Sequence, residues 1–257
     1  MLGVTVMLAI AGPGVMRNDP LAVDLDASFW PPSARFWLGS DELGRDLLTR
    51  CVYGVRLSLV AAFVVTNTAV GTGLIIGGVA GYVGGRVDNV LMRITEAFQT
   101  LPNFLLLLVL VVVFGSSIWT VTIAIGIVSW PAPARLTRAE FLSLRNREFV
   151  DAARALGVGD AKIIFGEILP NALPPLIVYA SVVMATAILL ESALAFLNLS
   201  DPNVASWGNL IGRGRTLLRT EWYVSALPGI AILVTVLAVS LFGQGLNDAL
   251  NPRLERR

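Results

Sequence analysis

Long runs of apolar residues, separated by short charged segments, are the feature of this sequence that most constrains its fold. A helix needs about 20 mainly apolar residues to cross the ~30 Å hydrocarbon core of a membrane. Such runs recur from about Leu57 to Phe242, and only 14% of the 257 residues are charged. A soluble domain carries roughly 25% charged residues, which it needs to cover its surface. The sequence therefore predicts an all-α integral membrane protein with about six transmembrane helices, and it excludes a soluble enzyme.

The expected organisation is a single transmembrane domain over residues 1–257. Residues 1–16 are apolar but lack the basic leader and the clear cleavage site of a signal peptide, so we interpret them as a first span whose N-terminal end is missing or wrongly assigned. The other expected spans are 57–82, 96–116, 118–134, 172–199 and 223–246. The connecting segments are 17–56, which carries an interfacial helix, the loops 135–171 and 200–222, and the tail 247–257.

The distribution of basic residues predicts the orientation of the spans. An even number of spans places both termini on one side of the membrane. When the termini are cytoplasmic, more Lys and Arg lie inside than outside, as the positive-inside rule requires. Under this assignment the loop 135–171 and the tail 247–257 are cytoplasmic, whereas the segments 17–56 and 200–222 are extracytoplasmic.

Several absences narrow the chemistry. The chain has no histidine and one cysteine, Cys51, so imidazole metal sites, intrachain disulfides and CxxC pairs are excluded. Its single lysine, Lys162, follows an alanine, so a phosphate-binding GxxxxGK[ST] loop is also excluded. A net charge of +1 argues against a nucleic-acid partner. We expect no cofactor in this chain, and if ATP drives the protein, another chain must bind the nucleotide.

Two local patterns predict helix contacts. Glycines at every fourth position, Gly73, Gly77, Gly81 and Gly85, form one helical stripe that lets another helix approach closely, either within this chain or at a subunit interface. Before that, Ser40 is suited to cap a helix that starts at Asp41. This second helix would be amphipathic and lie at the membrane interface, in contact with lipid or with a partner, and Cys51 would be a small buried residue on its apolar face.

The loop 135–171 is the most charged part of the chain and is long enough to carry structure of its own. Its spacing predicts a short amphipathic helix that ends at Gly157, a typical C-terminal cap. A second helix is predicted over Asp160–Leu169, stopped by Pro170. The apolar face of the first helix would present a knob to a soluble partner; it consists of Phe149, Ala152, Ala153 and Leu156.

The run DAARALG at 151–157, followed by ILPN at 168–171, resembles the EAA loop of binding-protein-dependent ABC importer permeases. Three further runs are similar to the dipeptide/oligopeptide/nickel subfamily: LGSDELGRDLLTR at 38–50, ESALAFLNL at 191–199 and SWGNL at 206–210. The first of these points to the second of the two permease subunit types. Asp151 stands where the family usually has glutamate, which keeps the charge.

The resemblance implies a cell-membrane subunit of a prokaryote that performs no covalent chemistry. Its partners would be a homologous permease, two cytoplasmic ATPase subunits or one fused ATPase, an extracytoplasmic substrate-binding protein and membrane lipid. ATP and Mg would be held by the ATPase, and transport would follow alternating access. The implied substrates are di- and oligopeptides; the alternatives are haem, a nickel chelate or glutathione.

The resemblance also assigns roles to residues. The segment that docks on the ATPase would comprise Glu148, Phe149, Asp151, Ala152, Ala153, Arg154, Leu156 and Gly157. Glu191, the acid deepest in an expected span, is either a pathway or gate residue or a helix-packing residue. The candidates for contact with the binding protein are Trp207, Arg213, Arg215 and Arg219.

Two rival classes are weaker. A self-contained secondary transporter or channel would show broken helices, ionisable relays and inverted repeats, and we find no convincing repeat in this sequence. A membrane enzyme would need a nucleophile and a base, and no such pair is evident. Association with an ATPase distinguishes the importer from both rivals, because either rival would be active as the isolated chain.

Overall fold

The computed structural model describes residues 2–16, 18–201 and 203–250, and within this part of the chain all regular elements are helices. The predicted tail 247–257 lies mostly outside the described residues. The helices are α1 Leu2–Val15, α2 Leu47–Val83, α3 Gly85–Thr100, α4 Asn103–Phe114, α5 Ile118–Ser129, α6 Pro131–Leu144, α7 Glu148–Ala155, α8 Asp160–Ile163, α9 Leu169–Phe196, α10 Trp207–Gly214 and α11 Tyr223–Leu250.

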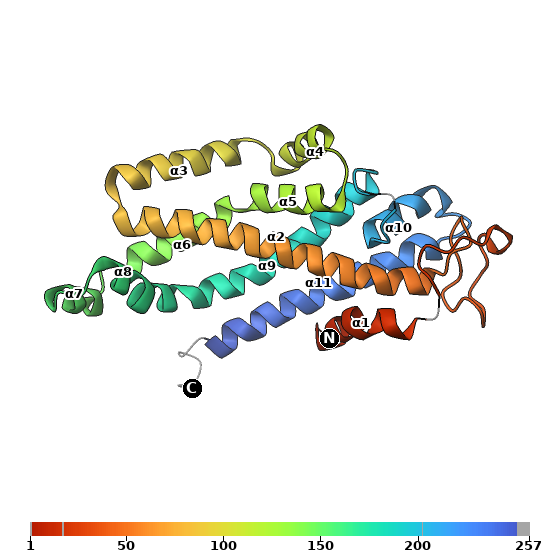
Figure 1. Cartoon of the computed structure of the whole chain (residues 1–257), viewed down its shortest axis with the longest axis horizontal. Coiled ribbons are helices and arrows are strands. Elements are labelled where there is room, and N and C mark those ends of the chain that lie inside the picture. Colours follow the sequence, from red (N-terminus) through yellow and green to blue (C-terminus); the bar gives the residue numbers. More distant parts are fainter. Residues whose placement is uncertain (1, 17, 202, 251–257) are drawn as a thin grey trace.

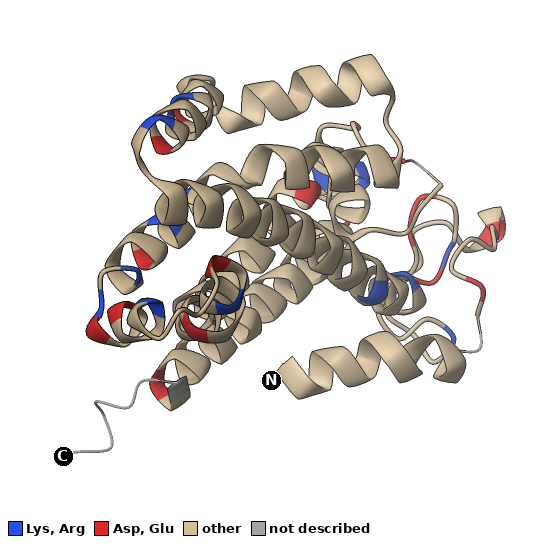
Figure 2. Cartoon of the chain, turned by 60° about the vertical axis from the view of Figure 1, so that its left-hand side comes forward, with Lys and Arg blue, Asp and Glu red and all other residues tan. Residues whose placement is uncertain are grey.

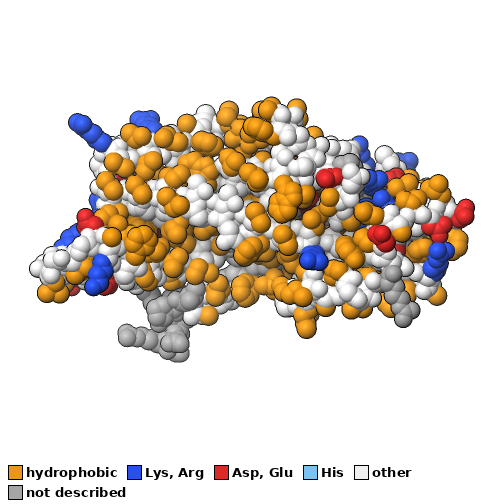
Figure 3. Space-filling model, viewed as in Figure 1, with side chains coloured by type: hydrophobic (Ala, Val, Ile, Leu, Met, Phe, Trp, Pro, Cys, Tyr) orange, Lys and Arg blue, Asp and Glu red, His pale blue; other side chains and the backbone are white. Residues whose placement is uncertain are grey.

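The long helices α2, α9 and α11 run side by side along the longest axis of the molecule (Figure 1). One end, the α7 end, carries α7 and α8. The other end, the α10 end, carries α10 and the segment 18–46 (Figure 1). Hydrophobic side chains cover most of the middle of the visible face, whereas charged side chains gather mainly at the two ends (Figures 2 and 3). This division is the one that a bilayer imposes on a protein that crosses it.

Three helices are long and apolar enough to cross a membrane: Leu47–Val83, Asp160–Phe196 and Tyr223–Ala249. Together α3 and α4 make a fourth if they are counted as one span, although they meet at an angle of 82°. The bend lies at Leu101–Pro102, where the proline pushes the preceding residue into an extended conformation. The helix α1 is apolar but shorter. The predicted number of six spans is therefore not confirmed among the described residues, and the predicted span 96–116 is divided by this bend.

The glycine stripe packs against α6 of the same chain. A Cβ atom on Gly77 would collide with the carbonyl oxygen of Ala134, and one on Gly81 would lie 2.7 Å from the Cβ of Phe141. Gly73 is equally close to Pro133. Gly85 differs, because it begins α3 with a positive φ of 58°, and a Cβ added to it would meet no atom within 4 Å. Three of the four glycines thus serve packing between helices of this chain.

The start of α2 corrects one prediction. No helix begins at Asp41: residues 41–44 form a turn, in which Gly44 has a φ of 69°, and Ser40 pairs with Asp46 in an isolated bridge. The helix starts at Leu47, capped by the Asp46 side chain, and continues without a break to Val83. The expected interfacial helix and the expected span 57–82 are therefore one element. Cys51 is buried in it, as predicted.

Pro170 does not stop the helix that precedes it. The residues Ile164–Ile168 form a π-helix between α8 and α9, and Pro170 lies in the first turn of α9. A π-turn widens the helix locally, so the missing N–H and the bulk of the proline ring are accommodated there. The helical path accordingly runs from Asp160 to Phe196.

Candidate functional site

The helix α7 has clear start and stop signals. Glu148 and Asp151 lie in its first turn and Arg154 in its last, which suits the helix dipole. At the C-terminus, Gly157 has a φ of 76° and its N–H donates to the carbonyl of Arg154 at 2.9 Å. The next N–H, that of Val158, donates to the carbonyl of Ala153 at 3.1 Å. These two bonds form a Schellman motif, whose positive-φ position favours glycine.

One side of α7 is buried in a small core at the α7 end. Val150 is fully buried there, and the sequence pattern did not single it out. Ala153 is half-buried and packs against the same core, so it faces inward rather than toward a partner as predicted. Besides Val150, the small core consists of Phe141, Ile163, Ile168 and Ala172, which come from α6, α8, the π-helix and α9.

The other side of α7 presents apolar groups to the surroundings. Leu156 is 84% exposed and Phe149 is 39% exposed. Ala152 is exposed between them, and we call these three residues the coupling face. Asp151 and Arg154 form an exposed ion pair at 3.3 Å beside this face. Such a pair contributes little stability, so both charges remain available to a partner.

Two polar contacts attach the α7 end to α2. The guanidinium of Arg145, just after α6, donates to the carbonyls of Gly81 and Tyr82 at 3.0 and 2.9 Å. The hydroxyl of Tyr82 lies 2.6 Å from a carboxylate oxygen of Asp160, at the start of α8. These bonds, with the small core, connect α7 to both α2 and α9. Sequence spacing gave no signal for them, because Tyr82 and Asp160 are 78 positions apart.

The α10 end is organised around a buried acid. Asp41 accepts hydrogen bonds from Arg45 and from Arg50, and all three side chains are buried. Burial alone would raise the pKa of Asp41, but the hydrogen bond from Arg45 and the charge of Arg50 hold it below its usual value. Next to this Asp41 cluster, Glu42 pairs with Arg213 at 2.8 Å, which ties the segment 18–46 to α10.

The predicted contacts with a binding protein differ in accessibility. Trp207 is fully buried and its indole N–H donates to the carbonyl of Cys51 at 3.0 Å. It therefore serves packing between α10 and α2, and the prediction that it contacts a partner is wrong. Arg213 is half-buried in its pair with Glu42. Arg215 is exposed and lies over the ring of Phe196, and Arg219 is exposed.

Glu191 lies in α9 close to the start of α10 and is 2% exposed. Both of its carboxylate oxygens are buried and have no hydrogen-bond partner among the described residues. A Cβ on Gly208 would lie 2.7 Å from the Cα of Ser192, so α10 is pressed against α9 at this level. The position fits the helix-packing interpretation of Glu191 better than a gate open to the surroundings. Within the described residues, no group of three or more His, Cys, Asp or Glu is placed to hold a metal.

Comparison with known proteins gives a consistent result. The family described as "Binding-protein-dependent transport system inner membrane component" matches residues 73–256. The chain is 40% identical to the di/tripeptide transport system permease protein DppC of Pseudomonas aeruginosa, covering 97% of this chain and 85% of that protein. It is 38% identical to the probable D,D-dipeptide transport system permease protein DdpC of Escherichia coli, covering 96% and 83%.

Among solved structures, the fold is similar to that in the inward-facing MetNI methionine ABC transporter. The TM-score is 0.67 at 19% identity, and the match covers 80% of this chain and 98% of that one. A crystal structure of an amino acid ABC transporter with histidines matches with a TM-score of 0.60 at 16% identity, covering 79% and 95%. At these identities the likeness concerns the fold.

Proposed function

The chain belongs to the family of binding-protein-dependent transport system inner membrane components, and we propose that it forms, with a homologous permease, the pathway of an ATP-driven importer of di- and oligopeptides. Two curated relatives that match nearly the whole chain are named as di/tripeptide and D,D-dipeptide permeases. Their names support peptides over haem, nickel chelates or glutathione. The family places the chain in the inner membrane.

The proposed assembly contains this chain, its homologous partner, two cytoplasmic ATPase subunits or one fused ATPase, and an extracytoplasmic binding protein. Because the sequence has no phosphate-binding loop, ATP and Mg would be held by the ATPase. The α7 end would face the cytoplasm and the α10 end the opposite side. In this assembly the chain would carry no catalytic residue of its own.

The observation that carries the proposal is the two-sided burial of α7. Val150 anchors the helix in the small core, while Leu156 and Phe149 remain exposed beside it. Apolar groups exposed at a charged end of a membrane protein are costly unless a partner covers them. We therefore propose that the coupling face docks in a groove of the ATPase, flanked by Glu148, Asp151 and Arg154.

The contacts behind α7 provide a route for force. Movement of the docked ATPase would shift α7, and the small core would pass the shift to α9 through Ile168 and Ala172. Arg145 and Tyr82 would pass it to α2. Because packed cores switch between discrete arrangements and do not deform continuously, this linkage suits a two-state alternating-access cycle.

The test is reconstitution of the whole complex in vesicles, with peptide uptake and ATP hydrolysis measured together. We expect ATP-dependent dipeptide uptake, and we expect Asp151→Lys to abolish uptake while the chain still inserts and pairs with its homologue. Wild-type transport rates in Asp151→Lys with the ATPase bound would contradict the docking assignment. Uptake by the isolated chain without an ATPase would support a secondary transporter or channel instead.

A further inference from the structure

One arginine on the apolar helices has no partner in the described part of the chain. The helices α1, α2, α4, α5, α9 and α11 carry four charged residues, Arg50, Arg56, Glu191 and Asp248. Arg50 is paired with Asp41, and Glu191 is 2% exposed and enclosed by the protein. Asp248 lies in the last turn of α11. Arg56 is exposed, and residues 2–16, 18–201 and 203–250 offer it no hydrogen bond or ion pair.

Arg56 lies where α2 leaves the α10 end and enters its apolar part. It lies nine residues after Leu47, which corresponds to about 14 Å along the helix axis. Arg56 therefore lies farther along α2 than the Asp41 cluster. The residues that follow it, from Leu57 to Val65, are almost all apolar. α2 has 37 residues, more than the ~20 that cross the hydrocarbon core, so Arg56 lies at the boundary between the α10 end and the apolar part of the helix.

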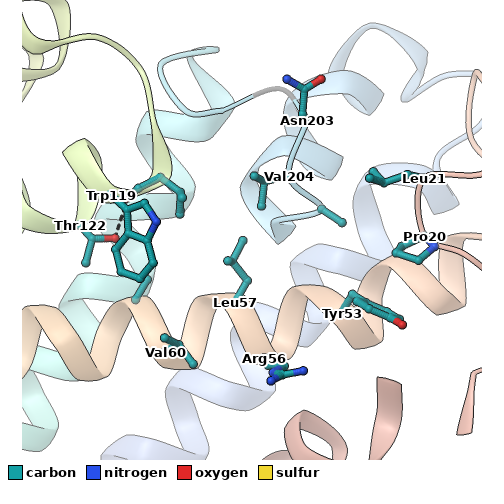
Figure 4. A pocket seen from close by; sticks show the side chains of 13 residues that line it. Pro20, Leu21, Tyr53, Arg56, Leu57, Val60, Trp119, Thr122, Asn203 and Val204 are labelled. Carbon is teal, nitrogen blue, oxygen red and sulfur yellow. Dashed lines mark hydrogen bonds between the residues drawn. The ribbon is translucent and has the colours of Figure 1, made fainter. Parts of the chain in front are cut away.

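Arg56 borders two cavities that lie on either side of it. The first has a volume of about 530 Å³ and lies between α2, the start of α5 and the loop 203–205. In Figure 4, Leu57 projects between Trp119 and Val204, whereas Arg56 lies at the rim on the opposite edge of α2. The second cavity has a volume of about 670 Å³ and is walled by α1, α2, α9 and α11. Both volumes fall in the range of small-molecule sites.

The residues that line the two cavities favour a ligand with a negative charge. Neither cavity has an Asp or Glu among its described lining residues, and Arg56 is the charged residue that the two share. A guanidinium binds a carboxylate with two parallel hydrogen bonds, a geometry that matches its planar fork. Thr122, Asn203 and Asn67 add neutral hydrogen-bonding groups to the walls. A ligand with a carboxylate would be favoured, whereas an ammonium group would find no counter-charge.

We propose that Arg56 binds the terminal carboxylate of a transported peptide as the peptide passes along the spanning helices. This inference rests on the proposed function and extends it by naming the residue and the chemical group. A lipid phosphate is the competing occupant. The setting favours the peptide, because α1 covers α2 at this level: the Tyr53 hydroxyl lies 3.5 Å from the Pro13 carbonyl, and Gly12 packs against Val52. Arg56 lies beside this α1–α2 contact and is itself exposed at the edge of the groove.

The experiment uses the complete complex in vesicles with the binding protein saturated by peptide. Uptake of a dipeptide and of the same dipeptide with an amidated C-terminus is measured per ATP hydrolysed. Loss of a hydrogen bond to a charged group is expected to reduce free-dipeptide uptake about tenfold in Arg56→Gln, with amide uptake and ATP hydrolysis unchanged. Arg56→Lys, which keeps the charge and loses the planar fork, should give uptake between that of Arg56→Gln and the wild type. Arg93→Gln, which removes an exposed arginine from α3, is the matched control and should behave as wild type.

Every other outcome would overturn the inference, and each would point to a different explanation. Equal free-dipeptide uptake in Arg56→Gln and wild type would show that the arginine does not bind the carboxylate, with the proposed function intact. An equal loss for the free and amidated peptides would indicate a packing role. A lipid phosphate would likewise give an equal loss for the free and amidated peptides, and dependence of that loss on anionic lipid would identify an anionic headgroup. If the wild type takes up no dipeptide with ATP, the proposed function itself fails, and this inference fails with it.

Discussion

The two ends of the molecule differ in the burial of their central charged and apolar side chains. At the α10 end, Asp41 is enclosed by Arg45 and Arg50, and Trp207 is fully buried with its indole N–H paired. At the α7 end, Leu156 and Phe149 are exposed while charged neighbours surround them. The α10 end thus buries its central acid, Asp41, against two arginines, although it also exposes Trp37 and Leu25, whereas the α7 end exposes the apolar groups of its short helix. A buried ion pair indicates a structural role, whereas exposed apolar groups beside a weak surface ion pair, as on α7, are accessible to a partner.

The largest effect is expected at the end of α7. No atom lies within 4 Å of a Cβ placed on Gly157, so a larger side chain would extend away from this chain and into the docking region. Gly157→Trp should abolish ATP-driven uptake in reconstituted vesicles, with insertion and pairing unchanged. Two controls separate bulk from backbone strain. Gly157→Asn tolerates the positive φ, and Gly157→Ala adds the strain of that conformation without bulk. Both should keep most of the uptake, and loss in Gly157→Ala with retention in Gly157→Asn would assign the effect to strain.

The Asp41 cluster should instead govern stability. Asp41→Asn leaves Arg45 and Arg50 buried without a counter-charge, which typically costs about 3–5 kcal/mol. Because the folded pKa of Asp41 is lowered, its contribution is present above the unfolded pKa and is lost as the pH falls through the folded value. Thermal unfolding of the wild type and the variant should therefore differ most near neutral pH and converge in acid. A gap that is independent of pH would show that the charge of Asp41 is not its source.

Substitutions of neighbouring residues on α7 should separate effects on ATPase binding from effects on stability. Leu156→Ala removes an exposed group, so it should weaken ATPase binding by on the order of 2 kcal/mol, roughly 30-fold, without lowering stability. Phe149→Ala should have a smaller effect on binding, because less than half of its side chain is exposed. Val150→Ala should lower stability by about 1–3 kcal/mol. If Val150→Ala weakened ATPase binding as much as Leu156→Ala and left stability at the wild-type value, the assignment of a buried and a docking side to α7 would be wrong.

Local signals were sufficient to predict α7 from the sequence. The spacing and Gly157 predicted a helix over 148–157, and the structure has α7 at Glu148–Ala155 followed by the glycine cap. The direction of its faces was harder to predict. Alanine occupies positions on both sides of the helix, and the burial of Val150 depends on residues from α6, α8 and α9 that are distant in the sequence. The packing of Ala153 against this core depends on the same distant residues.

Elsewhere, turn geometry and tertiary contacts overrode the local pattern. The residues after Ser40 have helical spacing, yet the turn at Gly44 and the burial of Asp41 delay the start of α2 to Leu47. Trp207 lies in a polar-looking loop, and only its contact with Cys51, 156 positions away, shows that it is packed inside. Pro102 could have indicated the bend between α3 and α4, because a proline disfavours a helical conformation in the residue before it.

The most direct test of docking at the α7 end is the reactivity of a thiol on the coupling face. The one native cysteine, Cys51, is buried, so a Leu156→Cys variant would carry one reactive site. Alkylation by a maleimide is measured in the permease pair with and without the ATPase, with Trp37→Cys at the α10 end as the control. We predict that the ATPase slows labelling of the Leu156→Cys variant at least about tenfold and leaves the control unchanged. Equal labelling of the Leu156→Cys variant in the assembled and unassembled states would contradict the assignment of α7 as the docking helix.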